Sequence, residues 1–269
     1  MRLAVGIDVG GTKIAAALVD VDSGVVLKTA RRPTDAARGG TAVLDECRAL
    51  ARSLAADVEP LGVGVAVCEL VGVDGRVRSA ETVDWREVDL SASFAELAPR
   101  VRVESDVRAA ALAEARLGAG AGERDFLYLS VGTGISHCLM VDGRPRLGVR
   151  GAAIGTGAPL VEEWSGGLAL ARLSGHASAE EALADRAAAS VVEDGARRLG
   201  LTLAILVNAL DPGALIVGGG LGSHERYRGL AVAAMREAIY DPAAREVPVL
   251  AAALGADAAV IGAALAAVP

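Results

Sequence analysis

Asp8-Val9-Gly10-Gly11-Thr12-Lys13 joins two apolar runs of the sequence, residues 2–8 and 14–20. Glycines between two such runs favour two strands joined by a tight turn. The same plan recurs later, where Gly132-Thr133-Gly134 joins the runs 126–131 and 135–141 and Asp142-Gly143 forms a hairpin turn. We interpret this recurrence as an internal duplication of one unit made of a strand, a glycine turn and a second strand.

Strands and helices alternate beyond the first glycine turn. The turn Asp22-Ser23-Gly24 leads into a third expected strand, residues 25–29, so the chain opens as a meander. Apolar residues from Gly40 to Ala56 recur with the period of an amphipathic helix, and residues 61–67 have the composition of a buried strand. Such alternation is typical of an α/β fold.

The second half of the chain continues this pattern. Ser178 and Glu181 have the spacing of a capping box, which predicts a long helix that runs to Leu210 with one break near Gly200. Residues 214–217 form an expected strand that ends in Gly218-Gly219-Gly220. The closing segment 256–268 is rich in alanine and almost without charge, so we expect a helix that is packed on all sides.

The composition excludes several classes of protein. The 269 residues are 52% hydrophobic and 23% charged, which suffices for a core and excludes a disordered chain. A formal charge of −7 has the wrong sign for a surface that coats nucleic acid or anionic lipid. Cys47, Cys68 and Cys138 lie far apart, so we expect free thiols and no zinc site. Asp8 within the first apolar run argues against a secretory signal, and we expect a cytoplasmic protein.

The glycine turns have the composition of a phosphate site. Glycine lets the backbone approach a ligand and point its amides at an anion, and Thr12 and Lys13 add a hydroxyl and an ammonium. A Walker A loop is excluded, because its residue order is absent and a strand follows where that loop needs a helix. A plain Gly-Gly hairpin with a surface lysine is the alternative. Two duplicated turns could grip one polyphosphate, and Gly218-Gly219-Gly220 offers a surface for a base or ribose.

Glu104-Ser105-Asp106 connects the expected strand 101–103 to a helix that begins near Val107. Ser and Asp at a helix start are ordinary N-terminal caps, and capping alone could explain them. The functional alternative is that Asp106 accepts the proton of an attacking hydroxyl.

These motifs together resemble those of the ROK family of sugar kinases and repressors, in the same order and over nearly the whole chain. The residues that carry the resemblance are Asp8-x-Gly10-Gly11-Thr12-Lys13, Glu104-Ser105-Asp106-x-x-Ala109-Ala110-Ala111-Leu112-Ala113-Glu114, Gly132-Thr133-Gly134-Ile135, Asn208-x-x-Asp211-Pro212 and Gly218-Gly219-Gly220-Leu221.

The resemblance implies an actin-like, ribonuclease H-like duplicated ATPase fold. Its two α/β domains would comprise residues 1–106, joined by the C-terminal helix 256–269, and residues 107–255. ATP and Mg²⁺ would be the cofactors, with Asp106 as the base and Asp8 holding Mg²⁺ through water. The resemblance places the phosphates on Gly10, Gly11, Thr12, Lys13, Gly132, Thr133 and Gly134, and the adenosine beside Gly218 and Gly219.

The chain departs from the family pattern on the sugar side. Ser105 stands where family hexose kinases carry Asn, and Gly155 and Ala158 stand where they carry a Glu and a His that bind the sugar. The family's zinc-binding cysteines are absent. Glu162 aligns with the acid that follows those cysteines, and Glu81 aligns with an Asn ahead of Trp85. We therefore expect the acceptor to contact Glu81, Ser105, Asp106 and Glu162.

Two functions of different classes fit these observations. The first is an ATP-dependent kinase that phosphorylates a hydroxyl of a small polyol, for which a cyclitol or amino sugar fits the altered residues better than glucose. The second is a non-catalytic sensor of sugar or nucleotide that keeps the fold. The repressor branch is disfavoured, because the first expected strand begins almost at Met1 and the charge is acidic. We expect no nucleic-acid or membrane partner, and a homodimer, as is common among relatives.

Overall fold

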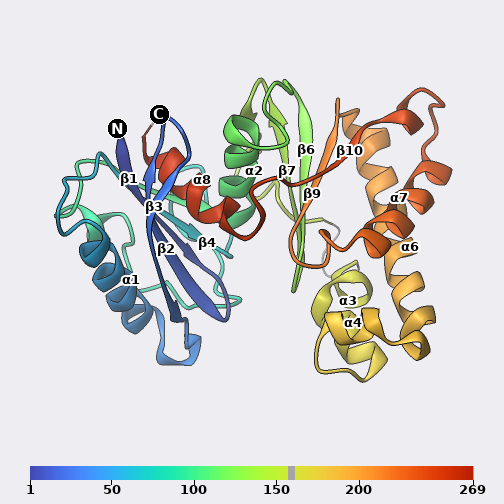
Figure 1. Ribbon diagram of the computed structural model, residues 1–269, viewed down its shortest axis with the longest axis horizontal. Coiled ribbons are helices and arrows are strands. Elements are labelled where there is room, and N and C mark those ends of the chain that lie inside the picture. The colour runs from blue at the N-terminus through green and yellow to red at the C-terminus, as the bar shows by residue number, and fades with distance from the viewer. Residues whose placement is uncertain (157–160, 269) are drawn as a thin grey trace. The chain divides into compact units, whose positions relative to one another are not determined.

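The computed structural model describes residues 1–156 and 161–268. The chain forms two compact units, each with its own sheet (Figure 1). The first unit comprises Met1–Gly118, Pro145–Ile154 and Asp257–Pro269, and the second comprises Ala119–Arg144 and Gly155–Ala256.

The sheet of the first unit has the strand order β3-β2-β1-β4-β5. β1 pairs antiparallel with β2, and the register Val9↔Ile14 places the first glycine turn between them. β1, β4 and β5 run parallel, so their carboxyl ends meet at one edge. The strands are β1 (Leu3–Val9), β2 (Lys13–Asp20), β3 (Val26–Pro33), β4 (Val63–Val67) and β5 (Val101–Ser105).

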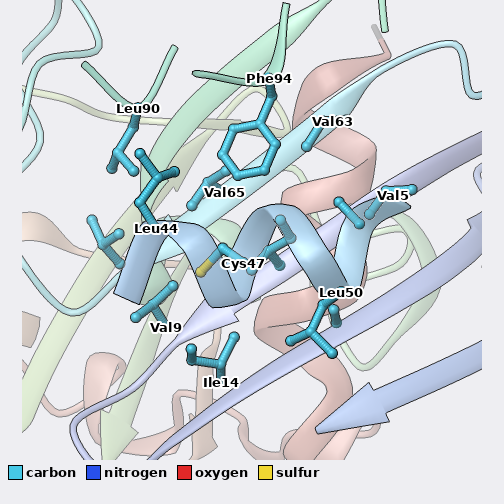
Figure 2. Close-up of a cluster of buried hydrophobic side chains, with 14 of the residues drawn as sticks. Val5, Val9, Ile14, Leu44, Cys47, Leu50, Val63, Val65, Leu90 and Phe94 are labelled. Atoms are coloured by element: carbon cyan, nitrogen blue, oxygen red, sulfur yellow. The ribbon is translucent and has the colours of Figure 1, made fainter. Parts of the chain in front are cut away.

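Helix α1 (Gly40–Leu54) covers one face of this sheet. Val5 and Ile7 of β1 and Val63 and Val65 of β4 point toward it, because successive residues of a strand alternate between faces. Figure 2 shows this core, in which Cys47 of α1 lies among the valines of the strands. The helix expected over 40–56 is thereby confirmed.

The opposite face of the first sheet is built for a very close approach of helix α8 (Ala258–Ala267). A Cβ atom on Gly6 would lie 1.9 Å from the carbonyl oxygen of Val260, and one on Gly64 would lie 1.8 Å from that of Ala263. Gly262 is likewise pressed against the Ala109 backbone of α2 (Asp106–Leu117). The alanine-rich closing segment is thus a helix that is buried on the sheet side and on the α2 side, as its composition predicts.

The sheet of the second unit repeats the plan of the first. Its order β10-β9-β6-β7-β8 corresponds, strand by strand, to β5-β4-β1-β2-β3. β6 pairs antiparallel with β7 across Val131↔Ile135 and parallel with β9, which pairs parallel with β10. The internal duplication inferred from the two glycine turns is confirmed by these matching orders. The strands are β6 (Phe126–Val131), β7 (Ile135–Val141), β8 (Arg144–Pro145), β9 (Leu215–Gly218) and β10 (Val249–Ala251).

The expected break of the long helix near Gly200 is wrong. Ser178 does cap a helix, since its hydroxyl accepts a hydrogen bond from the Glu181 amide. That helix is short, and residues 185–188 interrupt the helical run with a 3-10 turn. The following helix, Ala189–Leu210, runs through Gly200 without interruption. Gly200 lets helix α7 (Glu225–Ala238) pack closely, since a Cβ there would lie 2.3 Å from the Ala231 carbonyl oxygen. The helices are α3 (Glu162–Ser165), α4 (Gly167–Ser174), α5 (Ala179–Ala184), α6 (Ala189–Leu210) and α7 (Glu225–Ala238).

Short 3-10 turns complete the elements, at Ala36–Arg38, Ala92–Phe94, Arg186–Ala188, Ala244–Glu246 and Gly255–Asp257. In the described part of the chain, no helix combines the length and the apolar character that a bilayer span requires.

The compact units follow the chain differently from the expected domains 1–106 and 107–255. Helix α2 and residues Pro145–Ile154 belong to the first unit, together with α8. The boundaries of independently folding domains stay a proposal.

Two glycines test the packing of α6 on α7. Gly200→Ala should lower the free energy of unfolding by about 1–3 kcal/mol, because its methyl group meets the backbone of Ala231. Gly229→Ala is the matched control, since Gly229 lies exposed in α7 with open space around it. Alanine there should raise the free energy of unfolding by up to ~1 kcal/mol through helix propensity. Urea unfolding checks both values, and equal effects at the two positions would contradict the packing.

Candidate active site

The carboxyl edge of the first sheet gathers three segments that are distant in sequence. Val9, Val67 and Ser105 are neighbours in register at the ends of β1, β4 and β5. Each strand is followed at once by a polar or glycine-rich segment: Gly10, then Cys68 and Glu69, then Asp106. In open α/β sheets the crevice outside such carboxyl ends is the usual place for a ligand.

Asp106 is the first residue of α2 and is half-buried. Its Oδ1 atom accepts a hydrogen bond of 2.7 Å from the Val107 amide. Burial raises the pKa of Asp106 to about 6, the Val107 hydrogen bond opposes the rise, and the negative charge of Glu69 adds to it. A carboxylate with a raised pKa at a sheet edge has the properties of a general base.

The neighbouring Ser105 does not serve as an ordinary cap. Its hydroxyl makes no hydrogen bond to the helix amides, although it occupies the N-cap position of α2. Within residues 1–156 and 161–268 this buried Oγ atom has no hydrogen-bond partner at all. Capping therefore does not account for Ser105, whereas Asp106 does accept an amide at the start of α2.

Asp8 lies near the end of β1 and is half-buried. Burial raises the pKa of Asp8 to about 7, the charge of Asp106 adds to the rise, and the ammonium of Lys13 opposes it. Asp8 and Asp106, two acids at one edge, have the hard oxygen donors that a divalent cation prefers.

The first glycine turn is held from behind by Thr34, a residue that sequence reasoning missed. The Gly10 amide donates to the Lys13 carbonyl at 3.0 Å and closes the turn. Buried Thr34 donates through its hydroxyl to the Gly10 carbonyl at 2.6 Å and through its amide to the Thr12 carbonyl at 3.1 Å. With these carbonyls occupied, the exposed side chains of Thr12 and Lys13 are free to meet an anion.

The second glycine turn is held in the same manner by α4. The amides of Gly167 and Leu168 donate to the carbonyls of Gly132 and Thr133, at 2.7 and 3.3 Å. Sequence reasoning placed Glu162 among the acceptor ligands, whereas the structure shows its carboxylate accepting the Ile135 amide at 2.6 Å. Glu162 thus supports the second turn from within its own unit.

A pocket of about 360 Å³ opens beside the second turn, within the second unit. Leu168 is 68% exposed there, so the pocket offers an apolar side chain to a flat ring. Its lining comprises Gly132, Thr133, Gly167, Leu168, Ala171, Ala177, Ser178, Ala179, Glu180, Gly220 and Leu221.

The placement of Gly218 and Gly219 beside an adenosine stays a prediction, and the structure shows what surrounds the two residues. Neither residue lines the pocket, and a Cβ on Gly219 would lie 2.4 Å from the Val131 carbonyl oxygen. Gly219, with φ +82°, is needed for this close approach to β6. Gly220 and Leu221 take the place at the pocket wall.

The expected acceptor residues belong to two separate groups. Glu81 is exposed in the first unit, where its amide donates to the buried Glu69. Gly155 lies exposed in the second unit, bridged to Ser136 of β7, and Ala158 lies outside the described residues. The first unit thus brings together Asp8, Gly10, Gly11, Thr12, Lys13, Glu81, Ser105 and Asp106, and the second holds Gly132, Thr133, Gly134 and Glu162.

Arg108 is a further residue that the motifs did not reveal. It is buried in α2, two residues after Asp106, and pairs with Glu104. Its guanidinium also donates to the carbonyls of Gly151 at 2.8 Å and Val71 at 2.7 Å. Arg108 therefore ties the backbone at Gly151, a few residues before Gly155, and at Val71 to the helix that carries Asp106.

Comparison with known proteins identifies the family. A model of the ROK family matches residues 4–163 and 160–268, which together span nearly the whole chain. The chain belongs to the ROK family. The resemblance read from the motifs is confirmed.

Other ROK proteins share both sequence and fold with this chain. A glucokinase from Streptomyces coelicolor is 30% identical, over 82% of this chain and 83% of its own length. The ROK family glucokinase from Streptomyces griseus, solved with glucose and AMPPNP, superposes with a TM-score of 0.84 at 28% identity, covering 97% of this chain and 98% of its own. A ROK hexokinase from Thermus thermophilus gives 0.83 at 31% identity, covering 98% and 97%. The expected α/β, actin-like two-domain fold is thereby confirmed.

Proposed function

We propose that this ROK protein is an ATP-dependent kinase that phosphorylates a hydroxyl of a sugar or sugar-like polyol. Relatives named as glucokinases, as the bifunctional enzyme NanE/NanK and as an N-acetylgalactosamine kinase support a sugar kinase over a sensor without activity. The observation that carries the proposal is Asp106, whose pKa of about 6 leaves it deprotonated at neutral pH, at a sheet edge that also holds a glycine turn.

In this proposal Asp106 accepts the proton of the attacking hydroxyl. Burial brings the pKa of Asp106 close to neutral pH. A carboxylate with such a pKa is unprotonated at neutral pH and still basic enough to accept a proton. The Val107 amide fixes the carboxylate through Oδ1, so its other oxygen can face an acceptor. We assign the adjacent Ser105, whose hydroxyl is buried without a partner among residues 1–156 and 161–268, to orienting that acceptor.

We assign ATP to the two glycine turns and the pocket beside the second. The ring of the base would lie against Leu168 and Leu221, and Gly220 leaves room for the ribose. Thr133 lines the pocket, Gly134 follows it in the turn, and these two exposed residues would bind phosphate oxygens. Gly10, Gly11, Thr12 and Lys13 would supply amides, a hydroxyl and an ammonium to the phosphates from the first unit.

Asp8 fits a role in holding Mg²⁺ through water. Mg²⁺ is usually held by one or two carboxylates together with substrate phosphates and waters, and it rarely needs a full protein cage. The described residues contain no cluster of three potential ligands, and Asp8 with Asp106 nearby meets the smaller requirement. When bound, the ion would neutralise charge on the transferred phosphoryl group.

The acceptor is proposed to be an amino sugar or a cyclitol. Gly155 offers no side chain to a ring hydroxyl, and exposed Glu81 adds a carboxylate where family kinases have an amide. A carboxylate at that place can pair with an ammonium group of the acceptor. Glu162 contributes indirectly, by fixing the second turn. The cytoplasmic location and the homodimer expected from the sequence remain parts of this proposal.

The pH dependence tests Asp106 as the base. Because only the unprotonated carboxylate accepts a proton, kcat/KM for the acceptor should fall about tenfold per unit as the pH drops below about 6. Asp106→Ala should lower turnover by roughly 10²–10⁴-fold and leave the KM for ATP within a few fold. ADP release measured from pH 5 to pH 9 checks both, and near-normal turnover of the variant would reduce Asp106 to a structural residue.

An acceptor screen tests the proposed substrate class. ADP release should be fastest with an amino sugar or cyclitol, and plain glucose should be poor, because a buried site discriminates against acceptors that leave its polar groups unpaired. Glu81→Gln should lower kcat/KM for an amino sugar more than kcat/KM for its neutral parent sugar. A kcat/KM for glucose at or above ~10⁴ M⁻¹s⁻¹ would contradict this class. Nucleotide binding without ADP release on any acceptor would favour the sensor.

A further inference from the structure

Glu69 is a buried carboxylate that lies between two polar segments of the first unit. It is the second residue after β4 and is 2% exposed. Within residues 1–156 and 161–268 no lysine, arginine or histidine forms an ion pair with it. Burying a charge in this way is costly unless hydrogen bonds replace the lost water.

Four donors from one short loop surround this carboxylate. The amides of Thr82 and Val83 donate to Oε1 at 2.7 and 3.1 Å, and the Glu81 amide donates to Oε2 at 3.0 Å. The Ser79 hydroxyl donates to Oε2 as well. Hydrogen bonds to an ionised acceptor are about twice as strong as neutral ones, so the charge of Glu69 fixes residues 79–83.

Both ends of the loop 79–83 are anchored elsewhere. On one side Ser79 accepts the Leu70 amide at 2.9 Å, and the Arg78 amide donates to the Leu70 carbonyl at 2.7 Å, which closes a small hairpin. On the other side Trp85 is buried in the core beneath α1. Between these anchors, the backbone amides of residues 81–83 donate to Glu69.

The loop contacts the part of the site that the sequence assigned to phosphate. A Cβ on Gly11 would lie 3.2 Å from the Thr82 methyl group, so Thr82 packs against the first glycine turn. The adjacent Glu81 is exposed and carries the carboxylate proposed for the acceptor. Glu69 thus binds the backbone of two residues: Glu81, which is proposed to contact the substrate, and Thr82, which packs against the first glycine turn.

We propose that Glu69 is a positioning residue, whose buried carboxylate holds residues 79–83 so that Glu81 is presented to the acceptor and Thr82 supports the Gly10–Thr12 turn. The part that concerns the acceptor rests on the proposed function. The part that concerns the loop is independent of it.

Hydrogen exchange in Glu69→Gln tests the loop directly. An amide side chain keeps the size of Glu69 but has one acceptor oxygen, so the Glu81, Thr82 and Val83 amides should exchange at least ~10-fold faster than in the wild type. Asp89→Asn is the matched control, because the Asp89 carboxylate also accepts a backbone amide, that of Ala92, at an exposed place in the same unit. It should leave exchange at 81–83 unchanged. Unchanged exchange in folded Glu69→Gln would overturn the proposal.

Kinetics of the same variants test the acceptor part. With the best acceptor from the screen, Glu69→Gln should raise the acceptor KM about tenfold or more and the ATP KM by a smaller factor, because the loop carries Glu81 itself but meets the Gly10–Thr12 turn only through the Thr82 methyl group. A loss of folding alone would not give this split. Equal changes in both constants, or none, would overturn this part. Ser79→Ala removes a single donor and should act in the same direction more weakly; it replaces Glu69→Gln if that variant fails to fold. If the wild type turns over no acceptor, the proposed function fails, and the exchange measurement decides the role of Glu69.

Discussion

Val9, Val67 and Ser105 lie in register at the ends of three parallel strands, and the candidate site depends on that register. It places the residues after each strand at one edge: the first glycine turn, then Cys68 and Glu69, then Asp106. A shift of one residue would turn every strand side chain to the opposite face. Gly6 and Gly64 fix the register on the face covered by α8, since only glycine lets this helix lie so close to β1 and β4.

The price of this arrangement is a concentration of acid groups with little cationic compensation. Asp8 and Asp106 are half-buried, and each has a pKa well above the ordinary value of a carboxyl. Glu69 accepts three backbone amides, whereas Asp106 accepts only one, from Val107. Such a site destabilises the folded chain at neutral pH and is suited to receive a cation together with phosphates.

The features that could be predicted from the sequence are those formed by residues close together in the chain. The two glycine turns, the strands that flank them and the duplication could be read from residues that are adjacent in the chain, and Asp106 stood out because it follows a strand. Glu69, Thr34 and Arg108 could not be found in this way, because their importance comes from partners 10 to 43 positions away. Gly200 was misread as a helix break for the same reason: its close neighbour is on α7, and propensity says nothing of that helix. Glu162 was aligned with an acid of the family from its position in the sequence, and the structure gives it the backbone amide of Ile135 as a partner.

Thermal unfolding of Asp8→Asn at two pH values tests most directly whether the site stores this acid repulsion. A carboxyl whose pKa is raised from 3.8 to about 7 on folding favours the folded state while protonated, and that contribution is lost as the pH rises through this range. The uncharged amide of Asp8→Asn does not titrate, so the variant does not lose this stability as the pH rises. The account predicts that Asp8→Asn raises the melting temperature at pH 8 by about 5 °C or more, and by clearly less at pH 5. A variant that melts at or below the wild-type temperature at pH 8 would contradict it.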